Sequence, residues 1–164
     1  MTILKLNQII KEDYKKLDNL IKLINLKKRD ENKGIIILAG DLNQIEDLTS
    51  HLNSDLRKKM LTKWPGPHTW LVPSSSKTPK WLLGQSRLLA LRVSNHEGVQ
   101  KITSELEMPI CSTSANISGK SPAIDENQIR EFFGSKVHII EGELGGLTKP
   151  TPVQILESDE WIRK

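Results

Sequence analysis

The sequence predicts one α/β domain, built on an open, twisted mixed sheet that is largely parallel and is flanked by helices. Short β-branched runs alternate along the chain with segments whose apolar residues recur at helical spacing. The run Ile35–Leu38 is apolar without interruption, which is typical of a strand buried on both faces. The chain has 164 residues, of which 37% are hydrophobic, so we expect a single domain over residues 1–164.

Each expected element follows from a local pattern. Apolar residues between Tyr14 and Ile24 recur among lysines at helical spacing. Two pairs, Asp41 with Gln44 and Asp125 with Gln128, have the spacing of capping boxes that open helices. The expected helices cover residues 12–27 and 41–48, a segment with Leu56, Met60 and Trp64 on one face, residues 95–106, and a segment after Asp125. The expected strands cover residues 35–38, 69–72, 88–93, 109–111, 137–140 and 153–156.

Composition limits the classes of function. The net charge of +4 suits anionic ligands such as ATP or RNA. The single cysteine, Cys111, excludes an internal disulfide, and the four histidines lack the spacing of metal ligands, so we expect no structural metal. The sequence has no apolar run near the ~20 residues of a membrane span and no signal-peptide pattern. We therefore expect a cytoplasmic protein with no membrane partner.

A polar segment follows the apolar run 108–111. Residues 112–119, with the sequence STSANISG, combine hydroxyls, an amide and a glycine. We expect them at the carboxyl end of a strand, where open α/β sheets hold ligands. Neutral groups of this kind cannot act as general bases, but they can position a nucleotide or a carboxylate. The same residue types are also common in ordinary turns.

Two groups of cationic residues stand out. Lys27, Arg29 and Lys33 occupy one short segment between a helix and a strand, where they could converge on a phosphate or form a solvated basic turn. Arg92 interrupts the apolar run 88–93, where an unpaired buried charge would cost several kcal/mol. Its partner is either a structural carboxylate or a bound ligand.

Four segments, in chain order, resemble the YrdC/TsaC family of threonylcarbamoyl-AMP synthases. Leu26–Arg29 followed by Lys33-Gly34 is similar to the family's LK-x-R…KG, and residues 64–69 are similar to its WPGP-x-T. Residues 89–93 with His96 are similar to LAVRV…H, and residues 110–119 to STSAN-x-SG. The resemblance covers about residues 20–155 and implies a YrdC-like fold.

The resemblance also implies an activity. Family members condense L-threonine, bicarbonate and ATP into L-threonylcarbamoyl-AMP with release of pyrophosphate, for modification of tRNA next to the anticodon. It further implies Mg²⁺ bound with ATP, and as partners tRNA or double-stranded RNA and other tRNA threonylcarbamoylation proteins. The chain has no nucleophile–base pair, so we expect positioning and electrostatics rather than covalent catalysis.

The resemblance assigns roles to nine residues. The residues expected to bind ATP or its phosphates are Lys27, Arg29, Lys33, Ser114, Asn116 and Thr151. The residues expected to bind threonine are Arg92 and Ser112. Thr69 is a weaker candidate, because a threonine at the start of a strand usually has a structural role.

The N-terminal segment departs from the family pattern. Family members begin with a strand that ends in a YPTET-x-YGL-like sequence, and Met1–Asp13 contains no such sequence. Either the start of the chain is truncated or misassigned, or the strand is lost together with some or all of the activity. The alternative function is therefore a non-catalytic RNA- or nucleotide-binding module.

Overall fold

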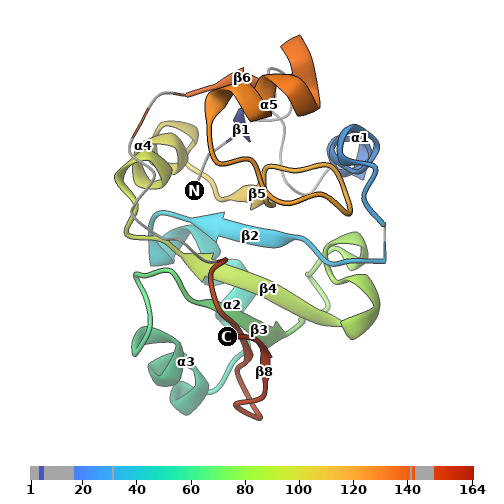
Figure 1. Cartoon of the computed structure of the whole chain (residues 1–164). Coiled ribbons are helices and arrows are strands. Elements are labelled where there is room, and N and C mark those ends of the chain that lie inside the picture. Colours follow the sequence, from blue (N-terminus) through green and yellow to red (C-terminus); the bar gives the residue numbers. More distant parts are fainter. Residues whose placement is uncertain (1–3, 6–16, 31, 141, 143–149) are drawn as a thin grey trace.

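A six-stranded mixed sheet forms the centre of a computed structural model of the chain (Figure 1). The structure describes residues 4–5, 17–30, 32–140, 142 and 150–164. The strand order is β5-β2-β4-β3-β7-β8, and a separate two-stranded sheet pairs β1 with β6. The strands are β1 (Leu4–Lys5), β2 (Ile36–Ala39), β3 (Thr69–Pro73), β4 (Leu88–Val93), β5 (Ile110–Ser112), β6 (His138–Ile139), β7 (Val153–Ile155) and β8 (Trp161–Arg163).

Helices and short 3₁₀ turns connect these strands. The α-helices are α1 (Leu17–Lys27), α2 (Glu46–Thr49), α3 (Ser54–Leu61), α4 (Glu97–Leu106) and α5 (Glu126–Phe133). The 3₁₀ turns are η1 (Leu42–Ile45), η2 (Lys80–Leu82), η3 (Gly84–Ser86) and η4 (Gly134–Lys136). Residues 12–16 of the first expected helix, and all of Met1–Asp13 except Leu4–Lys5, lie outside the described residues. No helix of the described segments is long and apolar enough to cross a bilayer.

The expectation of a largely parallel sheet is wrong. Only β2–β4 and β3–β7 are parallel, whereas β5–β2, β4–β3 and β7–β8 are antiparallel. Residues 74–87, all of them described, contain the turns η2 and η3 but no crossover helix. Because a parallel neighbour requires a long crossover, β4 returns beside β3 in the antiparallel sense.

The position of α4 explains the reversed direction of β5. An added Cβ on Gly40, just after β2, would lie 2.7 Å from Gln100 Cα and 2.4 Å from Thr103 Oγ1 of α4. The Gln44 side chain donates a hydrogen bond of 3.0 Å to Thr103 O. α4 therefore packs closely against the carboxyl end of β2. The chain enters β5 from that end and runs back along β2.

Side-chain caps begin several of the helices. Asp125 accepts a hydrogen bond from Gln128 N at 2.8 Å, which confirms Asp125 as the cap of α5, while Gln128 accepts from Ile124 N at 3.2 Å and not from Asp125 N as a capping box requires. His96 Nδ1 accepts from Gly98 N at 3.2 Å, so α4 begins at Glu97 rather than at residue 95.

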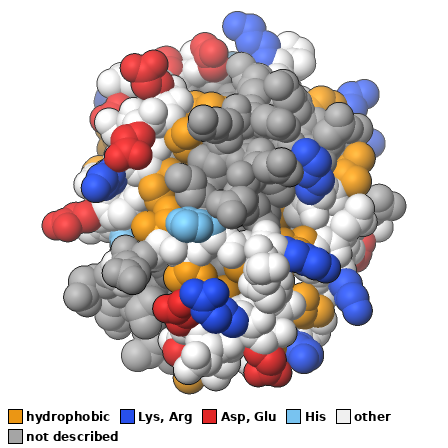
Figure 2. Space-filling view, turned by 90° about the horizontal axis from the view of Figure 1, so that it is seen from above, with side chains coloured by type: hydrophobic (Ala, Val, Ile, Leu, Met, Phe, Trp, Pro, Cys, Tyr) orange, Lys and Arg blue, Asp and Glu red, His pale blue; other side chains and the backbone are white. Residues whose placement is uncertain are grey.

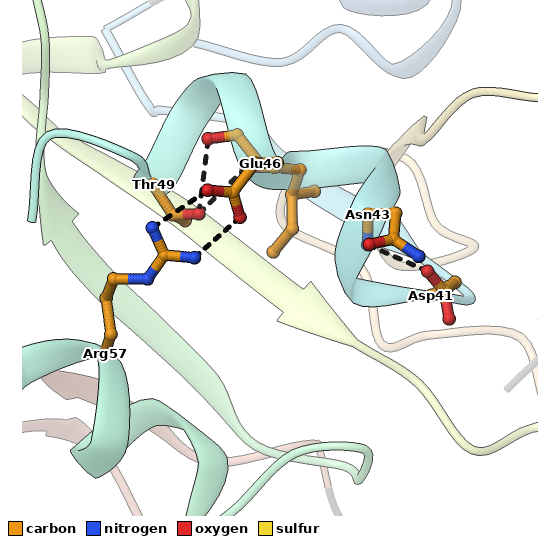
Figure 3. Close-up of polar contacts among 6 residues, drawn as sticks. Asp41, Asn43, Glu46, Thr49 and Arg57 are labelled. Carbon is orange, nitrogen blue, oxygen red and sulfur yellow. Dashed lines mark hydrogen bonds and ion pairs between the residues drawn. The ribbon is translucent and has the colours of Figure 1, made fainter. Parts of the chain in front are cut away.

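The segment after β2 differs from the capping box expected there. Asp41 accepts from Asn43 N at 2.8 Å and opens η1, while Gln44 accepts from Gly40 N instead of closing a box on Asp41 (Figure 3). α2 follows directly, and both carboxylate oxygens of Glu46 accept from Arg57 of α3, at 2.9 and 2.7 Å. This two-bond contact joins α2 to α3 at the surface.

One apolar core extends over the sheet and its helices. It includes alternate residues of β2, β3 and β4, such as Ile37, Trp70 and Leu91, with side chains of α2, α3 and α5. Trp64 is buried in it, although α3 ends at Leu61, so the expected helix is one turn too long. Burial raises the pKa of the Cys111 thiol to about 12, as expected for a core residue and not a nucleophile.

Two glycines allow the segment before β2 to approach η3. Gly84 has a φ of +59°, and an added Cβ there would lie 2.4 Å from Gly34 N and 2.5 Å from Asn32 O. An added Cβ on Gly34 would in turn lie 3.0 Å from Leu83 O. The glycine of the Lys33-Gly34 motif is therefore required for backbone packing.

We expect Gly84→Ala to destabilise the domain strongly, because the new methyl would overlap backbone atoms. Gly119→Ala is the matched control, since Gly119 also has a positive φ (+83°) but open space around its Cβ position. The control should lower the free energy of unfolding by about 1–2 kcal/mol from backbone strain alone. Gly84→Ala should cost at least about 3 kcal/mol in urea denaturation. Equal losses would show that glycine is needed at position 84 only for its positive φ and not for the space around its Cβ position.

Candidate functional site

Two of the residues predicted to bind ligand, Ser112 and Arg92, lie on one face of the sheet. Ser112 pairs with Ile36, and Arg92 pairs with Leu38 two residues further along β2. Because residues i and i+2 of a strand point to the same face, Ser112 and Arg92 share that face. Ser112 begins residues 112–119, which we call the serine–asparagine loop. This loop lies beside the basic junction, which consists of Lys27, Arg29 and Lys33. Arg92 belongs to a second group, an arginine cluster with Thr151 and Arg163.

The serine–asparagine loop lies at the amino end of β2, not at the carboxyl ends of parallel strands. It does follow the carboxyl end of β5, as expected. However, β5 runs antiparallel to β2, so its last residue, Ser112, pairs with the first residue of β2, Ile36. The reversal brings the loop beside the segment that leads into β2, which carries Lys27, Arg29 and Lys33.

The end of α1 determines where these cations point. Lys28 adopts a left-handed conformation with a φ of +49°. Arg29 N donates to Ile24 O at 3.0 Å and Lys28 N to Asn25 O at 3.3 Å, the two bonds of a Schellman motif. Glycine usually occupies this position, so the sequence contains no signal for the sharp turn. After the turn, Lys27 and Arg29 have different partners: Lys27 contacts the serine–asparagine loop and Arg29 contacts Gly34 O.

Lys27 holds the serine–asparagine loop. Its ammonium group donates to Ser114 O, to Asn116 O at 2.5 Å and to Asn116 Oδ1 at 3.3 Å. Its own carbonyl accepts a hydrogen bond from Ser118 N at 2.9 Å. The last residue of α1 is therefore bonded to the loop through both its side chain and its main chain.

Lys27 is buried between the loop oxygens and an aromatic ring. The residue is only 2% exposed, and its Nζ lies 5.9 Å from the centre of the Phe133 ring. Burial, with a smaller contribution from the Arg29 charge, lowers the pKa of Lys27 to about 8. Its expected contact with phosphate stays a prediction.

Within the loop, Ser114 and Asn116 are bonded to each other. Ser114 Oγ donates to Asn116 Oδ1 at 2.6 Å, and Asn116 Nδ2 donates to Lys120 O at 2.7 Å. Ser114 is exposed, and Asn116 is partly exposed. Both side chains can reach a ligand at the surface, and their predicted contacts with ATP stay predictions.

Arg29 and Lys33 present cationic groups next to this loop. Arg29 Nη2 donates to Gly34 O at 2.9 Å, while its buried Nε has no hydrogen-bond partner among the described residues. Burial lowers the pKa of Arg29, and the nearby Asp30 opposes that shift. Lys33 is exposed. This part of the site can therefore receive an anion.

Arg92 is 3% exposed and donates from Nη1 to Thr151 Oγ1 at 2.7 Å. Arg163 approaches the same threonine from β8, with Nε donating to Thr151 O at 2.8 Å. Burial and, secondarily, the Arg163 charge lower the pKa of Arg92 to about 10. The C-terminal segment, dark red in Figure 1, crosses in front of β4 and brings Thr151 to Arg92.

Arg163 was not predicted from the sequence. It stands in a short polar segment at the end of the chain, and nothing in residues 157–164 indicates a ligand site. Only the pairing of Arg163 with Val153 shows its place beside Thr151. A cationic side chain at the end of an edge strand was the one available signal.

Thr69 lies beside the arginine cluster. It pairs with Val153, and its N–H donates to Pro152 O at 3.0 Å. The residue is fully buried, and its hydroxyl has no hydrogen-bond partner among the described residues. A buried unsatisfied hydroxyl is rare enough to keep Thr69 as a candidate ligand contact. Ser112 is half-buried on the same face of the sheet.

Positive and negative side chains are unevenly distributed over the surface. On the face seen in Figure 2, Lys and Arg side chains gather mostly on the right and acidic side chains mostly on the left. The right side is the side of α1 in Figure 1. Within the described part of the chain, no group of three or more His, Cys, Asp or Glu side chains could hold a metal ion. The geometry thus favours an anionic ligand bound by cations, hydroxyls and amides.

An α/β domain with cations, hydroxyls and amides gathered in this way offers binding groups for an anionic ligand. The model of the Sua5/YciO/YrdC family, described as "Telomere recombination", matches residues 13–162. The chain is 39% identical over 145 residues to the threonylcarbamoyl-AMP synthase of Chromohalobacter salexigens, covering 88% of this chain and 78% of that one. It is 40% identical over 134 residues to that of Yersinia pestis, covering 80% and 70%. This chain belongs to the Sua5/YciO/YrdC family.

Solved structures confirm the α/β fold class with helices around a mixed sheet. Sua5 of P. abyssi complexed with L-threonine matches with a TM-score of 0.77 and 27% identity, over 86% of this chain and 42% of that chain. This chain thus spans less than half the length of Sua5. E. coli YciO matches with a TM-score of 0.75 and 21% identity, over 90% and 73%, which shows the fold alone.

The lowered pKa of Lys27 predicts a pH dependence of stability. Between its folded pKa of about 8 and the ordinary value of 10.5, the unfolded state holds a proton that the folded state has released. The contribution of Lys27 to the free energy of unfolding therefore rises with pH in that window, by at most about 1.4 kcal/mol per pH unit. The stability difference between wild type and Lys27→Met, measured by urea denaturation from pH 7 to 10.5, should rise. A flat difference would contradict the lowered pKa.

Proposed function

We propose that this chain forms L-threonylcarbamoyl-AMP from L-threonine, bicarbonate and ATP, with release of pyrophosphate. The observation that carries the proposal is the buried Arg92, on the same sheet face as the serine–asparagine loop. A buried guanidinium on that face suits a carboxylate, and the basic junction suits phosphates. The names of the synthases that are 39% and 40% identical support the same activity.

The proposed reaction joins three substrates without a covalent enzyme intermediate. The threonine amine forms a C–N bond to the bicarbonate carbon, and water leaves. An oxygen of the resulting carbamate then bonds to the α-phosphorus of ATP, and pyrophosphate leaves. Such a reaction needs the substrates held in line and the phosphate charge stabilised, which binding groups alone can provide.

The arginine cluster is the proposed threonine end of the site. Arg92 would bind the threonine carboxylate through its planar guanidinium, which Thr151 Oγ1 already orients at 2.7 Å. The unsatisfied hydroxyl of Thr69 lies beside this cluster, and Ser112 projects from the same face. L-Threonine in the P. abyssi Sua5 structure supports this choice of substrate.

The basic junction and the serine–asparagine loop are the proposed nucleotide end. Arg29 has an N–H without a partner among the described residues, and Lys33 is exposed beside it. Both can bind phosphate oxygens with charge-assisted hydrogen bonds. Ser114 and Asn116 offer a hydroxyl and an amide to the nucleotide, and Thr151, which touches both arginines of the cluster, would lie between the two ends of the site.

We propose that Mg²⁺ enters with ATP. The described residues contain no cluster of acidic or imidazole side chains that could hold it. The ATP phosphates would therefore supply most of its ligands, as is usual for Mg²⁺ bound with nucleotides. Bound in this way, the ion would neutralise phosphate charge. We further propose tRNA modification in the cytoplasm as the use of the product, with tRNA or double-stranded RNA and other threonylcarbamoylation proteins as partners.

The experiment that tests the function is pyrophosphate release by the purified chain with ATP, Mg²⁺ and bicarbonate. Release should depend on L-threonine, and mass spectrometry should detect threonylcarbamoyl-AMP. The matched control is Arg57→Gln, which breaks a surface contact on the α2–α3 side and should leave the rate unchanged. Binding of ATP without threonine-dependent release would favour the alternative of a non-catalytic binding module.

Arg92→Lys tests the proposed threonine end. Lysine keeps the charge but loses the planar fork that matches a carboxylate. We expect threonine affinity to fall by about tenfold or more, equivalent to about 1.4 kcal/mol, while ATP affinity changes less. Isothermal titration with each ligand separates these effects. An equal loss for both ligands would move Arg92 to the phosphates or to a general role in folding.

A further inference from the structure

We infer that Lys27 is a positioning residue: it orders the serine–asparagine loop and acts on the nucleotide only through Ser114 and Asn116. The inference rests on the proposed function and deepens it. It departs from the expectation, based on family resemblance, that Lys27 itself binds phosphate.

The donors of Lys27 are all directed at the loop. A lysine ammonium group has three N–H donors and no acceptor. Three loop oxygens lie within hydrogen-bonding distance of it: Ser114 O, Asn116 O at 2.5 Å and Asn116 Oδ1 at 3.3 Å. Each donor therefore has an acceptor inside the protein, and none is left for a phosphate.

Burial fixes the ammonium group in that place. Lys27 is 2% exposed, and the Phe133 ring lies 5.9 Å from Nζ. To reach a phosphate at the surface, Nζ would have to give up its hydrogen bonds to three oxygens of the loop, which is costly. In the same segment, by contrast, Lys33 has an exposed ammonium group and Arg29 is partly exposed.

The contacts of Lys27 also set the shape of the loop. The carbonyls of Ser114 and Asn116 point toward Nζ, so the N–H groups of the same two peptide units, on Ala115 and Ile117, point away from it. Neither N–H donates a hydrogen bond to a described residue. Asn116 Oδ1 accepts from both Lys27 and Ser114, which turns Nδ2 toward Lys120 O. Without Lys27, the carbonyls of Ser114 and Asn116 and the Asn116 side chain lose the donor that they share.

Amide hydrogen exchange of the ligand-free protein tests the ordering role directly. Lys27→Met should speed exchange by at least about tenfold at Asn116 and Ser118, whose N–H groups donate to Ser114 O and Lys27 O, because opening the loop would no longer break three charge-assisted bonds. Lys33→Met is the matched control, since it removes an exposed lysine of the same segment, and it should leave these rates unchanged. Unchanged exchange in folded Lys27→Met would overturn the inference whether or not the chain is a synthase.

A double-mutant cycle on ATP affinity tests how Lys27 acts on the ligand. If Lys27 acts through the loop, Lys27→Met and Asn116→Ala should each weaken ATP binding by about tenfold, and the double variant by little more than either. Lys33→Met combined with Asn116→Ala should instead multiply the two losses. Multiplication in the Lys27 cycle would show a direct phosphate contact and overturn the inference.

Lys27→Gln keeps the test decisive if the methionine variant does not fold. Glutamine retains two N–H donors but no charge, so it should preserve part of the loop protection and of the ATP affinity. Loss of affinity with loop exchange unchanged would again mean a direct contact. Failure of wild type to bind ATP would refute the proposed function, and the exchange measurements would still decide whether Lys27 orders the loop.

Discussion

The antiparallel pairing of β5 with β2 is the constraint on which the site depends. It places Ser112 beside Ile36, at the start of β2, and so brings the serine–asparagine loop to the end of α1. A parallel β5 would have carried that loop to the opposite end of the sheet, away from Lys27 and Arg29. The close packing of α4 against Gly40 imposes the direction, since a side chain at Gly40 would overlap the helix backbone.

Two buried cations organise the two ends of the site in different ways. Lys27 is surrounded by oxygens of the loop, and its charge stabilises backbone carbonyls that no other residue approaches so closely. Arg92 is oriented by Thr151 beside a second arginine, and this like charge adds to the cost of its burial. The role of Lys27 in the loop is visible in its hydrogen bonds, whereas the binding of an anion by Arg92 stays a proposal.

Local patterns predicted most elements of the fold. The strand at residues 88–93 was predicted to the residue, and Asp125 was confirmed as a helix cap by its hydrogen bond from Gln128 N. Strand directions were not predictable in this way. Alternating strands and helices suggested repeated parallel crossovers, but neither the short turns between β3 and β4 nor the crossing of α4 leaves a periodic signal in the sequence.

The sequence by itself determined which residues are candidates for the site, because charge in an apolar run and clustered hydroxyls are visible without coordinates. It identified Arg92, the basic junction and the serine–asparagine loop. Only the tertiary structure decided what each of them faces. The contacts of Lys27 with Asn116 and of Arg92 with Thr151 join residues 89 and 59 positions apart. Such contacts depend on strand order and direction, which are set by packing across the whole sheet and not by neighbours in the chain.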